Sequence, residues 1–251
     1  MDTIFKIRYL CVSITLRFMT PQVFTYSYPH PAVTVDCIIF GFDGQTLRVL
    51  LIQRAIEPFA QSWALPGAFL LENESLEECA SRVLQKECNI SGVYLEQLFT
   101  FGEPARDPRE RVLSIAYLGL IKTSDFELIA GNNELRVAWK DLSETTNLAF
   151  DHNQILQTAL TRIRGKIKYQ PIGFELLDSK FTIPQLQQLY EAILGKNLDR
   201  RNFRKKLLST KLLRQLSEKQ QNVAHKAAYF YEFDRDQYLQ LMQDGIYLEL
   251  V

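Results

Sequence analysis

The stretch Trp63-Ala64-Leu65-Pro66-Gly67-Ala68, followed by Glu74 and Arg82, decides how this chain folds. Ser75 with a glutamate three residues later is a capping box, in which the two side chains satisfy backbone N–H groups at the start of a helix. Glu74 and Arg82 are two i,i+4 steps apart and therefore share one face. Small apolar side chains occupy another face. The spacing predicts a helix over residues 75–87 that packs on a sheet, and an amphipathic helix with solvated charges is the alternative.

The same spacing resembles the Nudix box, a pyrophosphohydrolase signature that reads Gly, five residues, Glu, seven residues, then Arg-Glu-hydrophobic-any-Glu-Glu-any-Gly-hydrophobic. Glu74, Arg82 and Glu87 match it. Val83 and Lys86 stand where the family places metal-binding glutamates. Because Mg²⁺ requires several converging oxygen ligands, the resemblance implies a degenerate box with no catalytic residues and no metal site. It implies a domain that binds its ligand rather than cleaving it. Of the other positions, Ala68 replaces the first glycine, Leu84 and Ile90 match, and Asn89 departs.

Length and composition are those of an ordinary globular protein. A chain of 251 residues is long enough for two domains. Residues 1–21 look like an N-terminal extension, mis-started or disordered, and their apolar runs are too short to cross a bilayer. The cysteines show no CxxC pattern, which favours free thiols in a reducing cytoplasm. They are Cys11, Cys37, Cys79 and Cys88.

Charge is unevenly distributed although the formal net charge is zero. Residues 160–226 contain 15 Lys and Arg against 5 Asp and Glu, so the rest of the chain is acidic. Such asymmetry favours a polyanionic partner for the basic part. A solvated basic face is the plainer alternative.

The N-terminal half reads as strands around one helix. Apolar β-rich runs predict strands over residues 32–40, 47–53, 94–101, 112–121 and 136–139. A proline-rich basic loop, residues 103–109, separates two of them. A further helix is expected to run from Asp151, a plausible N-cap, to about residue 164.

The C-terminal half changes to helical periodicity. Residues 183–194 and 200–208 predict two helices, the second capped by Asp199, and residues 212–220 and 226–232 predict a β-ribbon. This order is that of a winged helix-turn-helix, and its basic second helix suits a DNA groove. A basic helical cap that packs on the first domain is the alternative. The candidate DNA-binding residues are Arg200, Arg201, Asn202, Arg204, Lys205, Lys206, His225 and Lys226, with Arg201, Asn202 and Lys205 facing outward.

Over residues 22–235 the chain closely resembles the NrtR family of Nudix-related transcriptional regulators. The motifs that carry this resemblance are residues 63–67, 106–109, 148–152 and 198–203. It implies an α+β protein, with a Nudix α/β/α sandwich on a mixed sheet followed by a winged helix-turn-helix domain. The expected parts are the extension 1–21, a Nudix-like sensor domain 22–145, a linker helix 146–170 and a winged helix 171–251.

The resemblance also implies a nucleotide effector related to NAD, such as ADP-ribose, or a phosphorylated sugar metabolite. Arginine forks suit phosphate oxygens and need no metal. Surface ion pairs are the alternative for each arginine. The candidate effector-binding residues are Arg54, Phe69, Arg106, Arg109 and Arg111, with Phe101 as a second stacking candidate. His152 is expected to pack locally, and a pH-sensing or ligand-contacting role is its alternative.

Together these features predict a cytoplasmic homodimeric repressor that binds a palindromic double-stranded DNA operator, with no membrane partner. The effector would move the winged helices out of register with half-sites about 34–36 Å apart. Two alternatives stay open. One is a Nudix hydrolase of ADP-ribose or a related nucleoside diphosphate, in which Glu87 and acids from other loops hold Mg²⁺. The other is a scaffold whose basic region binds protein or RNA.

Overall fold

The computed structural model describes Tyr28, residues 30–221 and residues 227–244. The predicted extension 1–21, His225 and Lys226 lie outside the described residues. No helix in the described ranges is long and apolar enough to cross a membrane.

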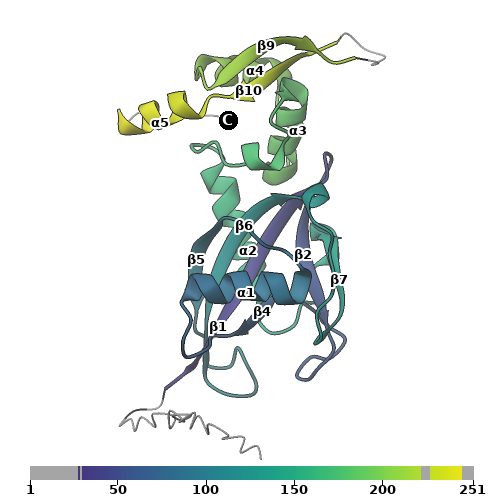
Figure 1. The fold of residues 1–251 in the computed structure, drawn as a ribbon, viewed down its shortest axis with the longest axis vertical. Coiled ribbons are helices and arrows are strands. Elements are labelled where there is room, and N and C mark those ends of the chain that lie inside the picture. The colour runs from purple at the N-terminus through teal and green to yellow at the C-terminus, as the bar shows by residue number, and fades with distance from the viewer. Residues whose placement is uncertain (1–27, 29, 222–226, 245–251) are drawn as a thin grey trace, which may run out of the picture. The chain divides into compact units, whose positions relative to one another are not determined.

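A mixed sheet forms the first part of the fold (Figure 1). Its centre is β1 (Ala32–Phe42), which pairs parallel with β6 (Val112–Lys122) and antiparallel with β2 (Leu47–Arg54). The order across the sheet is β3-β2-β1-β6-β5, with β4 on β1 and β7 on β2. The other strands are β3 (Trp63–Ala64), β4 (Gly67–Phe69), β5 (Leu95–Phe101) and β7 (Glu134–Asp141).

Two helices cover opposite faces of this sheet, α1 (Leu76–Cys88) and α2 (His152–Lys166). Alternate β1 side chains serve the two faces, because successive residues of a strand point in opposite directions. Cys37 and Ile39 pack with α1, and Ile38 packs with α2. Each fully buried isoleucine contributes roughly 1.5–3 kcal/mol to folding. The predicted α/β/α sandwich is therefore confirmed.

Helix α1 has the start that its sequence predicts. The Glu78 N–H donates to Ser75 Oγ at 3.2 Å, and the Ser75 N–H donates to Glu78 Oε2 at 2.7 Å. Asn89 ends the helix in the left-handed conformation, with φ 60°. Arg82 Nε donates to Glu74 Oε2 at 2.8 Å, and Arg82 Nη2 donates to the Phe69 carbonyl at 2.9 Å. The arginine thus ties strand β4 and the following loop to the helix.

The C-terminal part contains the predicted helix-turn-helix and ribbon. Helix α3 (Ile183–Leu194) starts at a second capping box, Thr182 with Gln185, and ends at Gly195 with φ 68°. Helix α4 (Arg200–Ser209) follows. A small sheet of order β8-β10-β9 completes the unit. Its strands are β8 (Phe181–Thr182), β9 (Leu213–Lys219) and β10 (Tyr229–Phe233), and short 3-10 turns lie at Thr123–Asp125, Leu142–Glu144 and Phe174–Leu176.

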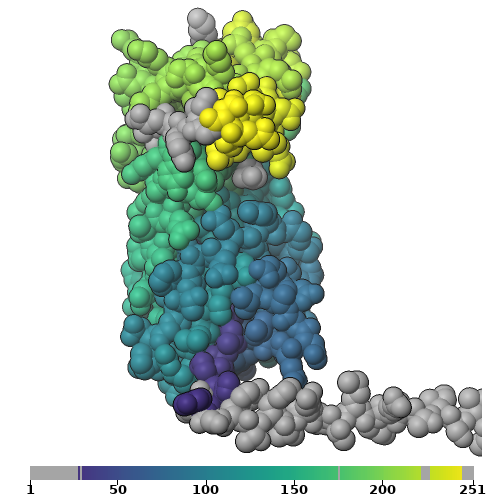
Figure 2. Space-filling model, turned by 90° about the vertical axis from the view of Figure 1, so that its left-hand side faces the viewer, coloured from purple at the N-terminus to yellow at the C-terminus, as the bar shows by residue number. Residues whose placement is uncertain are grey.

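The last described helix, α5 (Arg235–Gln243), has no fully buried residue. It begins at Asp234, whose carboxylate accepts from the Gln237 N–H at 3.0 Å. The helix is yellow in Figure 2 and lies at the surface. Its partly buried Tyr238 and Leu241 pack against the apolar core cluster that includes α3.

Candidate functional site

An open cavity of about 210 Å³ lies where β1, β2 and β4 meet the basic loop and the start of α2. We call it the sensor cavity. The residues that line it and carry polar or aromatic groups are Thr34, Asp36, Arg54, Phe69, Glu87, Arg106, Asp107, Arg109, Asn133, Glu134, Phe150 and His152.

At its base lies Asp36, a β1 residue that is 5% exposed. Its Oδ2 accepts from the Ser114 hydroxyl, and Arg106 Nη2 lies 3.4 Å from the same oxygen. Its Oδ1 lies 3.6 Å from His152 Nε2. A buried charge needs such partners, because desolvation otherwise makes it costly. Sequence reasoning missed Asp36, since a single acid within an apolar strand carries no motif.

The Asp36 carboxylate also explains the glycine of the 63–67 motif. A Cβ built on Gly67 lies 2.1 Å from Asp36 Oδ1 and 3.0 Å from the Val35 carbonyl oxygen. Gly67 is therefore required for close approach of β4 to β1. The same motif is bonded to β1 through the Cys37 N–H, which donates to the Pro66 carbonyl at 2.8 Å.

We expect Gly67→Ala to lower the free energy of unfolding by about 1–3 kcal/mol, the usual cost of overpacking. The methyl group would displace a carboxylate that three neighbours hold. Gly165→Ala is the matched control, because this α2 glycine has open space around it and alanine favours helix. Urea unfolding of both variants checks this, and equal stability of Gly67→Ala and the wild type contradicts it.

Arg106 is buried and already paired with a carboxylate, unlike an arginine that is free to bind phosphate. It is 7% exposed, and its Nε and Nη2 donate to the two Asp151 oxygens at 2.9 and 2.7 Å. Asp151 takes the N-cap position of α2, but its side chain makes no cap bond. The predicted N-cap position of Asp151 is therefore confirmed, but its carboxylate makes no capping bond because the charged pair with Arg106 occupies it.

His152 is buried and fixed at the first turn of α2. The Leu65 N–H donates to its Nδ1 at 2.9 Å, so that nitrogen carries no proton. Burial lowers the pKa of His152 despite the nearby Asp36 charge. A neutral ring suits both contacts. The Ala149 N–H also donates to the Trp63 carbonyl at 2.8 Å, so the 63–67 and 148–152 motifs are bonded to each other.

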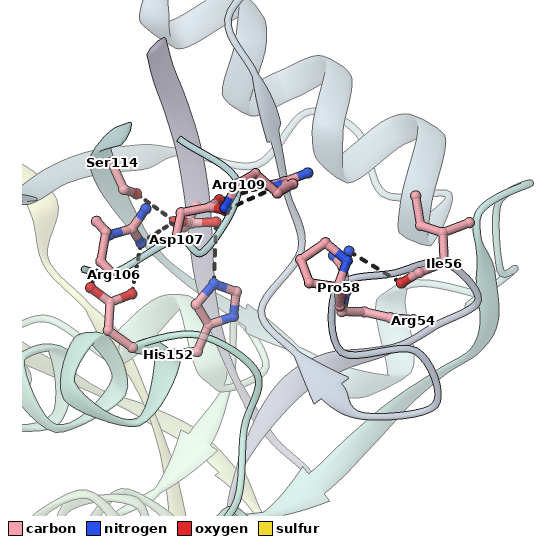
Figure 3. Close-up of polar contacts among 10 residues, drawn as sticks. Arg54, Ile56, Pro58, Arg106, Asp107, Arg109, Ser114 and His152 are labelled. Carbon is pink, nitrogen blue, oxygen red and sulfur yellow. Dashed lines mark hydrogen bonds and ion pairs between the residues drawn. The ribbon is translucent and has the colours of Figure 1, made fainter. Parts of the chain in front are cut away.

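Two further arginines, Arg54 and Arg109, line the cavity (Figure 3). Arg54 Nε donates to the Pro58 carbonyl at 2.9 Å, and burial, together with the Arg109 charge, lowers its pKa. Arg109 Nη2 donates to Asp107 Oδ2 at 2.7 Å, and this bond raises the pKa of Arg109. Both guanidinium groups lie near an aromatic ring, that of Phe150.

The other predicted effector residues divide between the cavity and its surroundings. Phe69 lines the cavity. Arg111 is exposed, donates to the Gly102 carbonyl at 2.7 Å, and is not among the described lining residues. Phe101 is buried against Phe99 and is also outside that set. Arg111 is close to Arg109 in sequence, but it immediately precedes strand β6, and its side chain bonds to the Gly102 carbonyl instead of lining the cavity.

Two acids, Glu87 and Glu134, line the same cavity as the arginines. Glu87 Oε2 accepts from the Gly67 N–H at 3.0 Å. Burial, reinforced by the Glu134 and Asp36 charges, raises the pKa of Glu87 to about 8. Burial also raises the pKa of Glu134. Glu87 therefore holds a proton through part of the neutral range.

This raised pKa gives a signed pH dependence. The folded protein retains the Glu87 proton between the ordinary value of 4.5 and about 8, whereas the unfolded chain loses it. Stability from this group is therefore present at low pH and falls as pH rises through that window, by up to about 1.4 kcal/mol per pH unit. We expect Glu87→Gln to flatten the decline between pH 5 and 8 in urea unfolding. Glu72→Gln, on an exposed loop, is the control, and identical profiles for the two variants would refute this assignment.

The basic helix α4 presents its predicted face to solvent. Phe203 and Leu207 are buried, whereas Arg201, Asn202 and Lys205 are exposed. The Asp199 carboxylate caps the helix by accepting from the Asn202 N–H at 2.8 Å. Arg200 and Arg204 are also exposed, and Lys206 is half-buried and engaged in a further contact. The geometry fits a groove-binding helix and excludes a buried basic cap over these residues.

The fold and the two sites define the class as a Nudix domain joined to a DNA-binding winged helix. The NUDIX domain model matches residues 30–159, and the model of the NrtR DNA-binding winged helix domain matches residues 173–233. The chain is 33% identical over 236 residues to the ADPR responsive transcriptional repressor NtrR of Acinetobacter baylyi, covering 90% of this chain and 94% of that relative.

Solved structures agree with this class. The crystal structure of Shewanella oneidensis NrtR complexed with a 27mer DNA matches with a TM-score of 0.68 and 31% identity, over 82% of this chain and 94% of that one. The NUDIX domain of the same protein complexed with ADP ribose matches with a TM-score of 0.51 and 34% identity, over 54% of this chain and 90% of that one. The chain belongs to the NrtR family of Nudix-related transcriptional regulators.

Proposed function

We propose that this chain is a transcriptional repressor that binds operator DNA through α4 and its wing and responds to ADP-ribose in the sensor cavity. The observation that carries this is the exposed basic face of α4, with Arg201, Asn202 and Lys205 turned to solvent. Arginine can form paired hydrogen bonds to guanine and asparagine to adenine, while lysine suits phosphate.

The effector assignment follows from the charges of the sensor cavity. Arg54 and Arg109 both line the cavity and supply two guanidinium groups, of which Arg54 is bonded to a backbone carbonyl and Arg109 to Asp107. A diphosphate matches two such groups through forked hydrogen bonds. The names of the Acinetobacter relative and the Shewanella complex make ADP-ribose the first effector to test, ahead of a sugar phosphate.

A symmetric operator follows from a homodimer, which we propose as the active form in the cytoplasm, where its DNA lies. Two recognition helices of a dimer read half-sites about 34–36 Å apart. An effector that binds more tightly to a dimer with a different spacing of these helices weakens DNA binding. The loss of DNA-binding free energy cannot exceed the difference between the effector's binding free energies for the two states.

The DNA-binding surface is tested by the double substitution Arg201→Ala with Lys205→Ala. We expect it to weaken binding to the DNA upstream of the protein's own coding sequence by about ten-fold or more and to reduce the salt dependence, because phosphate and base contacts are lost. Lys168→Ala removes an exposed cation outside α4 and serves as control. Gel shifts across salt concentrations give the measurement; equal affinity of the double variant and the control disproves the assignment.

We further propose that effector binding needs no Mg²⁺ and that the domain does not hydrolyse its ligand. At two of the box positions that supply metal-binding glutamates in the family, this chain has residues that cannot bind Mg²⁺. Val83 is buried among apolar side chains of the α1 face, and Lys86 carries a positive charge. The hydrolase alternative depends on Glu87 and Glu134, both of which line the cavity.

Hydrolysis and metal dependence can be tested together. With ADP-ribose and Mg²⁺ we expect no AMP above a protein-free blank, since converging carboxylates are missing at two box positions. Calorimetric affinity for ADP-ribose should agree within about two-fold in EDTA and in Mg²⁺, because arginine contacts require no metal. Steady AMP formation that EDTA abolishes would instead establish the hydrolase.

A further inference from the structure

Two aromatic rings and one arginine form a stack at the opening of the sensor cavity. The Arg109 guanidinium carbon lies 5.0 Å from the Phe69 ring centroid and 5.6 Å from that of Phe150. Both distances are within the range of a cation–π contact. Neither ring is fully buried, so these aromatics are not simply part of the apolar core. One cation thus contacts two aromatic rings that line the same cavity.

Phe150 holds this position in an unusual backbone conformation. Its φ is 54°, and that of Phe59, whose ring lies 4.8 Å from it edge to face, is 63°. Left-handed backbone is costly for bulky residues and persists where the surroundings enforce it. Two aromatic residues are kept in this state beside the cavity, while Arg54 lies 5.0 Å from the Phe150 centroid.

A hydroxyl group without a partner lies beside the Phe69 ring. Thr34 is 8% exposed, and its Oγ1 has no hydrogen-bond partner among the described residues. Thr34 and Phe69 are directly paired across β1 and β4. Directly opposed residues of an antiparallel pair have side chains on the same face. A buried polar group of this kind is costly unless a ligand satisfies it.

The size of the cavity indicates that the stack must open. Its volume of about 210 Å³ is below the roughly 300–1,000 Å³ usual for sites that enclose organic ligands. Arg109 is an exposed residue, but its guanidinium is paired with the buried Asp107 carboxylate. It can therefore leave the rings only by a rotation that keeps this ion pair, since a buried charge without its partner is costly. Its departure would free the Phe69 and Phe150 surfaces and leave Arg109 close enough to contact a phosphate.

We infer that Phe69 and Phe150 form the subsite for the heterocyclic base of the nucleotide effector, with the base replacing Arg109 against the rings and Thr34 bonding to its edge. A flat base offers the same π-face contact to the rings that the guanidinium does. The edge of a base carries hydrogen-bond donors and acceptors, and one of these would be the partner that the Thr34 hydroxyl lacks. This inference rests on the proposed nucleotide effector and adds which residues select a base over a bare sugar phosphate.

The test measures ADP-ribose affinity of the full chain by calorimetry for Phe69→Leu, Phe150→Leu and Thr34→Val. We expect about a ten-fold or greater loss for each phenylalanine variant, because base–aromatic stacking is lost, and a several-fold loss for Thr34→Val. Phe99→Leu is the matched control, since this exposed phenylalanine lies outside the described lining residues, and it should stay within two-fold of wild type.

Thermal unfolding without ligand separates binding from folding. Thr34→Val removes an unpaired buried hydroxyl at nearly constant shape, so we expect its melting temperature to equal or exceed that of wild type while its affinity falls. A merely structural role for Thr34 would not give that combination. Ribose 5-phosphate, which lacks a base, should bind the wild type at least ten-fold more weakly than ADP-ribose.

The outcomes distinguish the subsite from the proposed function. If wild type binds ADP-ribose but Phe69→Leu and Thr34→Val bind it as Phe99→Leu does, the subsite is wrong while the effector assignment stands. Equal affinity of wild type for ribose 5-phosphate and ADP-ribose also overturns the subsite. If wild type binds no ADP-ribose while still shifting operator DNA, the effector assignment fails and the subsite fails with it.

Discussion

The buried carboxylate of Asp36 is the constraint around which the sensor domain is arranged. Ser114, Arg106 and His152 all approach it, and they come from β6, the basic loop and α2. Breaking such a buried charged network by removing one partner typically costs about 3–5 kcal/mol, because a charge is left unpaired. Its space requirement also dictates the glycine at the start of β4. The same interaction therefore sets how closely β4 approaches, where the loop lies and how α2 begins.

Local rules explain why so much of the fold can be predicted from sequence. The Ser75 and Thr182 capping boxes and the Asp199 cap are contacts within three residues, and the structure contains all of them. Continuous burial along β1 from Thr34 to Phe42 marks a strand covered on both faces, as the apolar run indicates. The exposed face of α4 follows from helical periodicity alone. Where short-range chemistry decides an element, the pattern of residue types is sufficient.

Long-range pairing sets the limit for the candidate site. Arg106 and Arg109 belong to one short motif and look equivalent in sequence, yet one is buried against Asp151 and the other is exposed. The partner of Arg106 lies 45 residues away, so no local pattern reveals it. Phe150 belongs to the 148–152 motif, but the motif does not reveal its left-handed backbone or its contacts with Arg54 and Phe59. Residue type identifies these arginines and aromatic residues as candidates, but only their contacts in the folded structure show which role each one has.

The position of Phe150 has a mechanical consequence. It immediately precedes the N-cap of α2, whose 15 residues make a rod about 22 Å long. Near the far end of that rod, Arg164 Nε donates to the Ile193 carbonyl of α3 at 3.0 Å, joining it to the helix-turn-helix. A pivot of about 10° at the first turn would displace the distal end by about 4 Å, more than the length of a hydrogen bond. A small displacement of the Phe150 ring would therefore be enlarged along α2, and the helix-turn-helix would lose its alignment with the DNA half-site.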